Sequence, residues 1–168
     1  MEKNDFWQLI DASRQAAGGD PEEQIEALTE QVAELEPDEI VAFDRILSEY
    51  HARAYDWGLW GAAYVIGGGC SDDGFMDFRG WLISRGEKDY EAALADPESL
   101  LGVVTDSDGD CQVEGFQYIA SQVWEEKTGK SGDDFPSHDI ERRKDPTGMP
   151  WEEDELEARF PMLCEKFF

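Results

Sequence analysis

A long charge-free stretch lies in the middle of an otherwise strongly acidic chain, and it constrains the fold more than any other feature. No charged residue occurs between positions 57 and 71, although the 168 residues carry a formal net charge of -26. Within this stretch Trp57, Trp60 and Tyr64 recur at helical spacing, and small or aliphatic residues fill the other positions. A helix that is apolar on every face is normally buried on every face. The pattern therefore predicts a fully buried helix at the centre of the protein.

A second helix is expected directly after this one. The glycines at 67–69 end the first helix, because glycine adopts the left-handed backbone conformation that follows a helix end. Ser71 can cap the next helix, with Asp72 and Asp73 in its first turn, where the helix dipole favours acidic side chains. Apolar residues then recur at helical spacing as far as Gly86. The two helices and the polar turn between them would be the centre around which the chain is organised.

Amphipathic patterns predict further helices on both sides of this pair. Apolar residues recur at steps of three and four over residues 4–17, 21–35 and 37–54 before it, and over 87–95 and 116–128 after it. We find no sustained alternation of apolar and polar residues of the kind that marks a β-strand. The sequence therefore predicts an all-α fold.

The last forty residues differ from the rest in composition. Residues 130–150 show little apolar periodicity and several prolines and glycines, which predicts an extended arm. Residues 152–160 indicate a short acidic helix, and the chain then ends in an apolar segment that includes Phe168. We expect this segment, Phe168 included, to dock back on the core.

These patterns predict one domain over residues 1–168, a length that can bury a substantial core. We expect a single-domain helical bundle of six to eight helices. Its helical core would span residues 1–129, and an irregular C-terminal arm with a short helix would span residues 130–168.

The charge balance restricts the kinds of partner. Acidic residues outnumber basic ones by 40 to 14. Such a surface repels phosphate groups, so we expect no direct nucleic-acid binding and no membrane association. The same surface favours a protein partner with a basic surface, and it leaves open an acidic mimic of nucleic acid.

The compartment follows from the N-terminus and the cysteines. The opening MEKNDFWQLI lacks the basic and apolar regions of a secretory signal, and no apolar run is long enough to span a bilayer. Cys70, Cys111 and Cys164 are odd in number and widely spaced, which indicates reduced thiols and no disulfide framework. We therefore expect a cytoplasmic protein.

The central stretch also carries a family resemblance. The segment LWGAAYVIGGGCSDDGFMDFRGWLISRG and the residues YEAALADP after it resemble the bacterial family catalogued as domain of unknown function 4240. The opening FWQLI, and WEED and RFP near the end, are similar to it as well. Members of this family are sometimes found beside WGR domains of regulator-like proteins, which points to regulation. The resemblance implies no catalytic residue, ligand or cofactor.

The polar turn between the two central helices holds the sharpest group of candidate site residues. A thiol just before a helix N-terminus, as at Cys70, can be acidified by the helix dipole. Arg79 follows Asp72 by seven residues on the same helix face, so the two can bracket a small polar ligand. The alternative is structural: Asp72 and Asp73 cap the helix, Cys70 is a small buried side chain, and Arg79 pairs internally with a carboxylate.

These residues define a candidate pocket at the Gly67–Asp73 junction. His51, one of only two histidines, lies on the expected helix over residues 37–54 and is added because it can face the junction. A lone histidine on a helix is more often structural, so its inclusion depends on geometry. The candidate pocket consists of His51, Trp57, Trp60, Tyr64, Cys70, Asp72, Asp73 and Arg79.

We predict neither a metal site nor a cofactor. The acidic run from Asp106 to Asp110 resembles a calcium-binding loop, but Cys111 stands where that loop needs glycine and Gln117 where it needs glutamate. The cysteines lack the spacing of a zinc site, and phosphate-binding and dinucleotide-binding motifs are absent from the sequence. An acidic surface loop is the expected interpretation of residues 106–110.

Three functions remain open from sequence, and whether the chain is an enzyme is one of the open questions. The leading hypothesis is a non-enzymatic protein-interaction or regulatory domain, because no complete set of catalytic residues is present. The first alternative is a small enzyme or small-molecule binder with its pocket at the Gly67–Asp73 junction. The second is the acidic nucleic-acid mimic.

Overall fold

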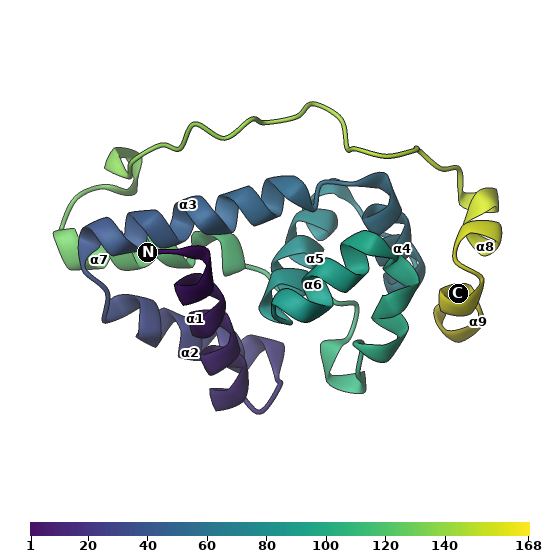
Figure 1. Cartoon of the computed structure of the whole chain (residues 1–168), viewed down its shortest axis with the longest axis horizontal. Coiled ribbons are helices and arrows are strands. Elements are labelled where there is room, and N and C mark those ends of the chain that lie inside the picture. Colours follow the sequence, from purple (N-terminus) through teal and green to yellow (C-terminus); the bar gives the residue numbers. More distant parts are fainter.

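Short turns join the α-helices of this protein into one bundle, which an extended segment crosses on one side (Figure 1). The computed structural model describes residues 1–168 apart from the side chain of Ser107. The bundle helices are α1 (Lys3–Ala16), α2 (Pro21–Ala33), α3 (Pro37–Arg53), α4 (Trp57–Gly67), α5 (Asp72–Ser84), α6 (Glu87–Ala95) and α7 (Ile119–Thr128). Three short 3-10 turns connect α6 to α7: η1 (Pro97–Gly102), η2 (Asp106–Asp108) and η3 (Phe116–Tyr118). The all-α class predicted from the sequence is confirmed.

The helices begin and end where local sequence signals place them. The Asp20 carboxylate accepts hydrogen bonds from the backbone amides of Glu22 and Glu23, both at 3.0 Å, and Ser71 accepts one from Gly74 at 3.1 Å. These caps satisfy amides that have no partner inside the first turn of a helix. At the other end of α4, Gly68 has a φ of 66°, the left-handed conformation that glycine adopts without strain. The bounds of α2, α4 and α5 are therefore largely local in origin.

The core forms where α1, α2, α3, α5 and α7 pack against one another. Its largest side chains are aromatic, and the polar atoms among them are paired. The indole Nε1 of Trp7 donates to the Tyr50 hydroxyl at 3.0 Å, and the Tyr90 hydroxyl donates to the Tyr50 backbone carbonyl at 2.8 Å. These bonds tie α1 and α6 to α3, because a buried tyrosine or tryptophan needs a partner for its polar atom.

The prediction that α4 is buried on every face is wrong. One side of the helix is buried, with Leu59 1% exposed and Val65 0% exposed, but Trp57, Trp60 and Tyr64 are only partly buried. Trp57 and Tyr64 lie on the side of α4 that faces the C-terminal segment, whereas the Trp60 ring stacks on Phe75 of α5 at a centroid distance of 4.9 Å. The side chain of Trp151 packs edge-on against Trp57 and Tyr64, at centroid distances of 6.2 Å and 5.2 Å. Helical periodicity identified an apolar surface and could not show that a distant segment covers it only in part.

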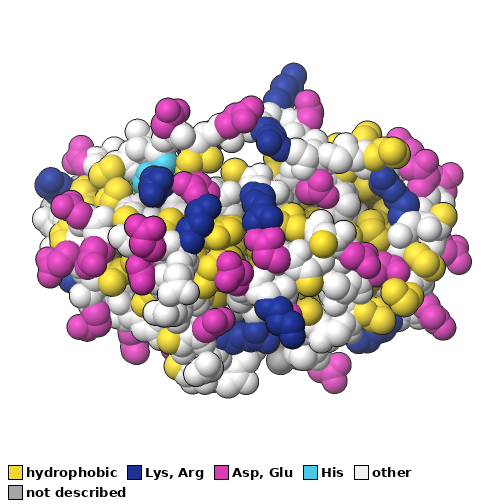
Figure 2. Space-filling model, viewed as in Figure 1, with side chains coloured by type: hydrophobic (Ala, Val, Ile, Leu, Met, Phe, Trp, Pro, Cys, Tyr) yellow, Lys and Arg dark blue, Asp and Glu magenta, His cyan; other side chains and the backbone are white. Residues whose placement is uncertain are grey.

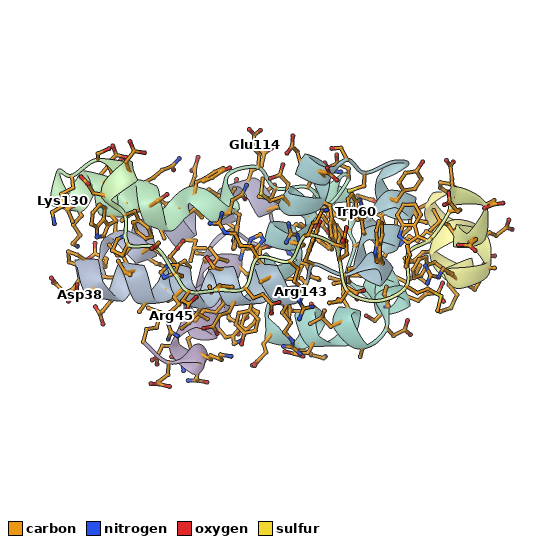
Figure 3. The ribbon with its side chains drawn as sticks, turned by 90° about the horizontal axis from the view of Figure 1, so that it is seen from above. Asp38, Arg45, Trp60, Glu114, Lys130 and Arg143 are labelled. Atoms are coloured by element: carbon orange, nitrogen blue, oxygen red, sulfur yellow. The ribbon has the colours of Figure 1, made fainter. Side chains whose placement is uncertain are left out.

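The arm leaves α7 through η4 (Gly132–Asp134) and runs in an extended form along α3 to the opposite end of the molecule (Figures 1 and 3). The Phe135 ring packs edge-on against Trp124 at 5.4 Å, which holds the start of the arm. Near its end, the Thr147 amide donates to the Tyr55 carbonyl at 3.0 Å, and the Trp57 amide donates to the Thr147 carbonyl at 2.8 Å. An isolated parallel β-bridge between Asp56 and Thr147 results, and the described residues form no β-strand.

The C-terminal segment docks on α4 through η5 (Glu153–Glu155), α8 (Leu156–Arg159) and α9 (Pro161–Phe167). Leu156 and Leu163 are both 0% exposed, so the apolar end of the chain returns to the core as expected. Phe168 does not follow the expectation, because its side chain is 57% exposed at the free end of the chain. No helix in the described part of the chain combines the length and the apolar character needed to cross a bilayer.

The turn-rich segment between α6 and α7 is less exposed than an acidic surface loop. Asp108 is 6% exposed, and its Oδ1 accepts a hydrogen bond from Trp81 Nε1 at 2.9 Å. Arg85 Nη1 lies 3.4 Å from the same oxygen, and Arg85 Nη2 donates to the side chain of the buried Gln24 at 2.7 Å. A buried charge needs such partners, since its desolvation is otherwise costly. The carboxylate of Asp108 is therefore part of a buried polar network.

Candidate functional site

A cleft of about 970 Å³ lies between the arm and the helices beneath it. We call it the arm cleft. Its walls come from α3, α5, the Trp60 side chain of α4 and the η3–α7 region, and residues 135–143 of the arm form its roof. Figure 3 looks down on this side and labels Arg143 of the arm and Trp60, both of which line the cleft. The arm cleft exists only because the arm crosses the bundle without filling the space below it.

Arg79 is a polar group of the cleft wall that backbone and aromatic contacts hold in place. Its Nη1 donates to the His51 backbone carbonyl at 2.9 Å, and its guanidinium lies 4.9 Å from the ring centroid of Tyr55 and 5.2 Å from that of Phe75. Burial lowers the pKa of the Arg79 guanidinium from its usual value, although the group remains charged at neutral pH. Among the ion pairs of the described residues, none involves Arg79. The guanidinium is thus held in place without a carboxylate partner.

His51 lies beside Arg79 and is a neutral group in this fold. Its Nε2 atom is buried and has no hydrogen-bond partner in the described chain. Burial first, and the Arg79 charge second, lower the pKa of His51 to about 3. Its ring is therefore neutral at physiological pH, and its buried Nε2 is left without a partner in the described chain.

The second histidine enters the cleft from the arm. His138 Nε2 lies 2.7 Å from Asp44 Oδ2 on α3, and both side chains are largely shielded, at 11% and 14% exposure. Burial raises the pKa of Asp44, and the hydrogen bond to His138 opposes that rise. This pair fastens the middle of the arm to α3, between the Phe135 contact and the Thr147 bridge.

Gln117 of η3 carries another buried polar atom at the cleft. Its Oε1 has no hydrogen-bond partner among the described residues, while its Nε2 makes only a long contact of 3.4 Å with Asp77 Oδ1. Buried side-chain oxygens are usually paired. Two of the cleft-lining side chains, His51 and Gln117, thus have buried atoms without protein partners.

The structure separates the eight residues of the predicted pocket into two groups. Five of them line the arm cleft: His51, Trp60, Asp72, Asp73 and Arg79. The other three, Trp57, Tyr64 and Cys70, are not part of its lining. Trp57 and Tyr64 instead contact the C-terminal segment through Trp151. The cleft therefore extends from the edge of the α4–α5 junction toward α3 and the arm.

The idea that the helix dipole acidifies Cys70 is wrong. Burial, with the charges of Asp110 and Asp77, raises the pKa of the Cys70 thiol to about 12. The backbone carbonyl of Cys70 has a structural role, since it accepts a hydrogen bond from Trp60 Nε1 at 3.0 Å. Desolvation and neighbouring carboxylates outweigh the dipole of α5 at this position.

The chain matches one known protein family. A family model described as "Protein of unknown function (DUF4240)" matches residues 1–126. The chain belongs to the DUF4240 family. The DUF4240 match covers α1 to α6 and most of α7, and with them His51, Asp72 and Arg79 of the cleft wall. Neither the curated proteins nor the solved structures gave a match to the chain.

The arm lies beyond the DUF4240 match, and sequence reasoning missed its contribution. His138, Arg142 and Arg143 line the cleft, although the sequence pointed only to an irregular arm. One signal was present: Arg142, Arg143 and Lys144 form the only run of three basic residues in a chain with 14 in total. Such a run in an acidic protein is a reason to ask what it faces. Within the described part of the chain, no group of three or more His, Cys, Asp or Glu side chains is arranged to hold a metal ion.

Proposed function

We propose that this protein is a non-enzymatic binding domain that holds a small polar ligand in the arm cleft. The observation that supports it is Arg79, a fixed and partly buried guanidinium on the cleft wall with no carboxylate partner in the described chain. Arginine at such a position is well suited to bind an acidic group through two parallel hydrogen bonds.

Binding without turnover agrees with the chemistry of the cleft. A general base works best when its pKa is near the working pH. His51 has its pKa lowered to about 3, so it is a weak base, and His138 is already hydrogen-bonded to Asp44. These two groups support recognition of a ligand better than proton transfer.

A cleft-filling variant tests the proposal. Ala52 lines the cleft on α3, so Ala52→Phe should occupy part of its volume, whereas Ala12→Phe adds the same side chain at an exposed position of α1. A panel of small carboxylates, phosphates, amines and zwitterions is screened by the thermal unfolding of the full chain. We expect at least one compound to raise the unfolding midpoint of the wild type and of Ala12→Phe but not of Ala52→Phe. A compound that stabilises all three proteins equally binds elsewhere and contradicts the proposal.

A protein partner is a second candidate, favoured by apolar side chains exposed near the C-terminus. Met149 is 72% exposed, Met162 49% and Phe168 57%. Exposed large apolar side chains are common at protein interfaces. A cytoplasmic regulatory partner with a basic surface would combine these contacts with the acidic charge. The test is affinity capture with the wild type and with Met162→Ser/Phe168→Ser as baits; a partner held equally by both contradicts this candidate.

The acidic surface supports mimicry of nucleic acid less well. Mimicry calls for carboxylates in two lines with the spacing of phosphates. On the face shown in Figure 2, Asp and Glu side chains are spread among basic and apolar ones. This distribution favours a general role in solubility for the acidic residues.

A further inference from the structure

We propose that the ligand of the arm cleft is a small zwitterion of the amino-acid or dipeptide class, with its carboxylate on Arg79 and its amino group toward Asp72 and Asp73. This inference rests on the proposed function, since it names the ligand of the same cleft. It is carried by the positions of the charges on the cleft wall and by the apolar side chains that line the wall and the roof.

The carboxylate end is argued from the geometry of Arg79. Two of its nitrogens have backbone partners: Nε contacts the Phe75 carbonyl at 3.4 Å, and Nη1 donates to the His51 carbonyl at 2.9 Å. Nη2 has no hydrogen-bond partner among the described residues. The aromatic faces of Tyr55 and Phe75 hold the guanidinium in this orientation. Less side-chain entropy is then lost when an acidic group binds.

The amino end is argued from the first turn of α5. Asp72 and Asp73 are exposed at the edge of the cleft, and Asp72 precedes Arg79 by about 10 Å along the helix axis. The Arg79 side chain turns back toward them, since its Nε reaches the carbonyl of residue 75. No ion pair joins the arginine to either aspartate among the described residues, so the opposite charges lie apart along one wall. A ligand with a positive and a negative end can contact both.

The overall charge of the cleft favours a ligand with no net charge. Its lining has three arginines, Arg79, Arg142 and Arg143, and three carboxylates, Asp72, Asp73 and Glu141. His51 is neutral, and His138 is paired with Asp44. A polyphosphate would meet three carboxylates in the cleft, and a simple cation would meet the partly buried Arg79. Either ligand would place its charge next to cleft side chains of the same sign, whereas a zwitterion can place each of its ends next to a side chain of opposite sign.

Apolar side chains line both the wall and the roof of the cleft. Leu47, Met76, Phe135 and Ile140 all line the cleft. The Trp60 ring is fixed between the rings of Trp57 and Phe75, at centroid distances of 5.3 Å and 4.9 Å. An apolar side chain on the ligand would contact this surface and remove it from water. The preferred zwitterion therefore carries a large apolar side chain.

The experiment uses the full chain and isothermal titration calorimetry. The common amino acids and their glycyl dipeptides are titrated first, and the best binder is then compared with its analogue lacking the amino group and its analogue lacking the carboxylate. We expect the affinity of each analogue to be lower by roughly tenfold or more, because one charged hydrogen-bonded end is lost.

Matched variants assign each end of the ligand. Arg79→Met should weaken binding of the zwitterion about tenfold or more and leave binding of the carboxylate-free analogue unaffected. If the methionine variant does not fold, Arg79→Lys is used instead, because it keeps the charge but loses the two parallel hydrogen bonds of a guanidinium. Asp72→Asn/Asp73→Asn should weaken the zwitterion and spare the analogue without an amino group. Glu22→Gln/Glu23→Gln removes two exposed acids from the first turn of α2, outside the cleft, and should change nothing.

Two results overturn the inference in distinguishable ways. If only simple acids or only simple amines bind, and Ala52→Phe abolishes that binding, the zwitterion is wrong while the proposed function stands. If no compound of any class binds in a manner sensitive to Ala52→Phe, both fail.

Discussion

The Nη1 atom of Arg79 on α5 donates a hydrogen bond to the backbone carbonyl oxygen of His51 on α3, at 2.9 Å. The bond joins two bundle helices at the wall of the arm cleft. It also brings a permanent positive charge next to a buried imidazole, which adds to the effect of burial in keeping His51 neutral. Protonating His51 in the folded protein therefore costs free energy.

That cost predicts a pH dependence of stability. The pKa of His51 is about 3 in the folded protein and 6.5 in the unfolded chain, so acidification protonates the unfolded chain first. Neutral His51 makes its full contribution to the free energy of unfolding above about pH 6.5. That contribution is lost progressively as the pH falls toward 3, and about 2 kcal/mol of it is lost at pH 5. Urea unfolding of the wild type and of His51→Gln at about pH 8 and pH 5 measures it. The glutamine variant should lose less stability on acidification; parallel losses in the two proteins would contradict the prediction.

Asp108→Asn should destabilise the fold far more than its position in a turn-rich acidic segment suggests. The change removes the charge that neutralises the buried Arg85 and weakens the acceptor for Trp81 Nε1. Leaving a buried charge without its partner costs about 3 kcal/mol or more. Chemical denaturation followed by circular dichroism checks the value, with the exposed Asp106→Asn as the matched control. A change within about 0.5 kcal/mol, as at an ordinary surface site, would show that the network is not important for stability.

Gly61→Ala should loosen the C-terminal segment. A Cβ atom at this position of α4 would lie 2.7 Å from Phe160 and 3.1 Å from the indole nitrogen of Trp151. The overlap forces those side chains to move, at a cost of about 1–3 kcal/mol, which exceeds the gain of about 1 kcal/mol in helix propensity. Hydrogen exchange of α8 and α9 measures the loosening. Gly67→Ala in the same helix meets only ordinary contacts, the nearest at 3.6 Å, and should leave exchange unchanged. Equal protection in both variants would mean that the packing adapts without cost.

Cys70 should react slowly with alkylating reagents. Its thiol has a pKa of about 12, so very little thiolate is present at neutral pH, and only the thiolate is nucleophilic. We expect iodoacetamide to modify it at least about tenfold more slowly than a free thiol of ordinary pKa. Mass spectrometry of the native protein over time measures the rate, with Cys70→Ser to identify the site. Rapid modification of Cys70 would restore the idea of a thiol activated at the N-terminus of α5.

Much of the cleft wall could be anticipated from sequence, and its roof could not. Asp72 and Arg79 lie seven residues apart on one helix, so their common face follows from helical spacing alone. His51 was included because its helix was expected to pack near α5. His138 and Arg143 belong to an arm without periodicity, and no sequence rule states where such a segment crosses the bundle.

The sequence by itself determined the all-α class, the positions of most helices and the acidic character of the surface. These properties are local, because capping residues, glycines and apolar spacing act over a few residues at a time. Only the tertiary structure decided that the aromatic side of α4 is partly open, that Asp108 is buried with Arg85, and that the arm covers a cleft. Each of these depends on contacts between segments far apart in the chain, such as the bridge from Thr147 to Asp56, and packing alone selects those contacts.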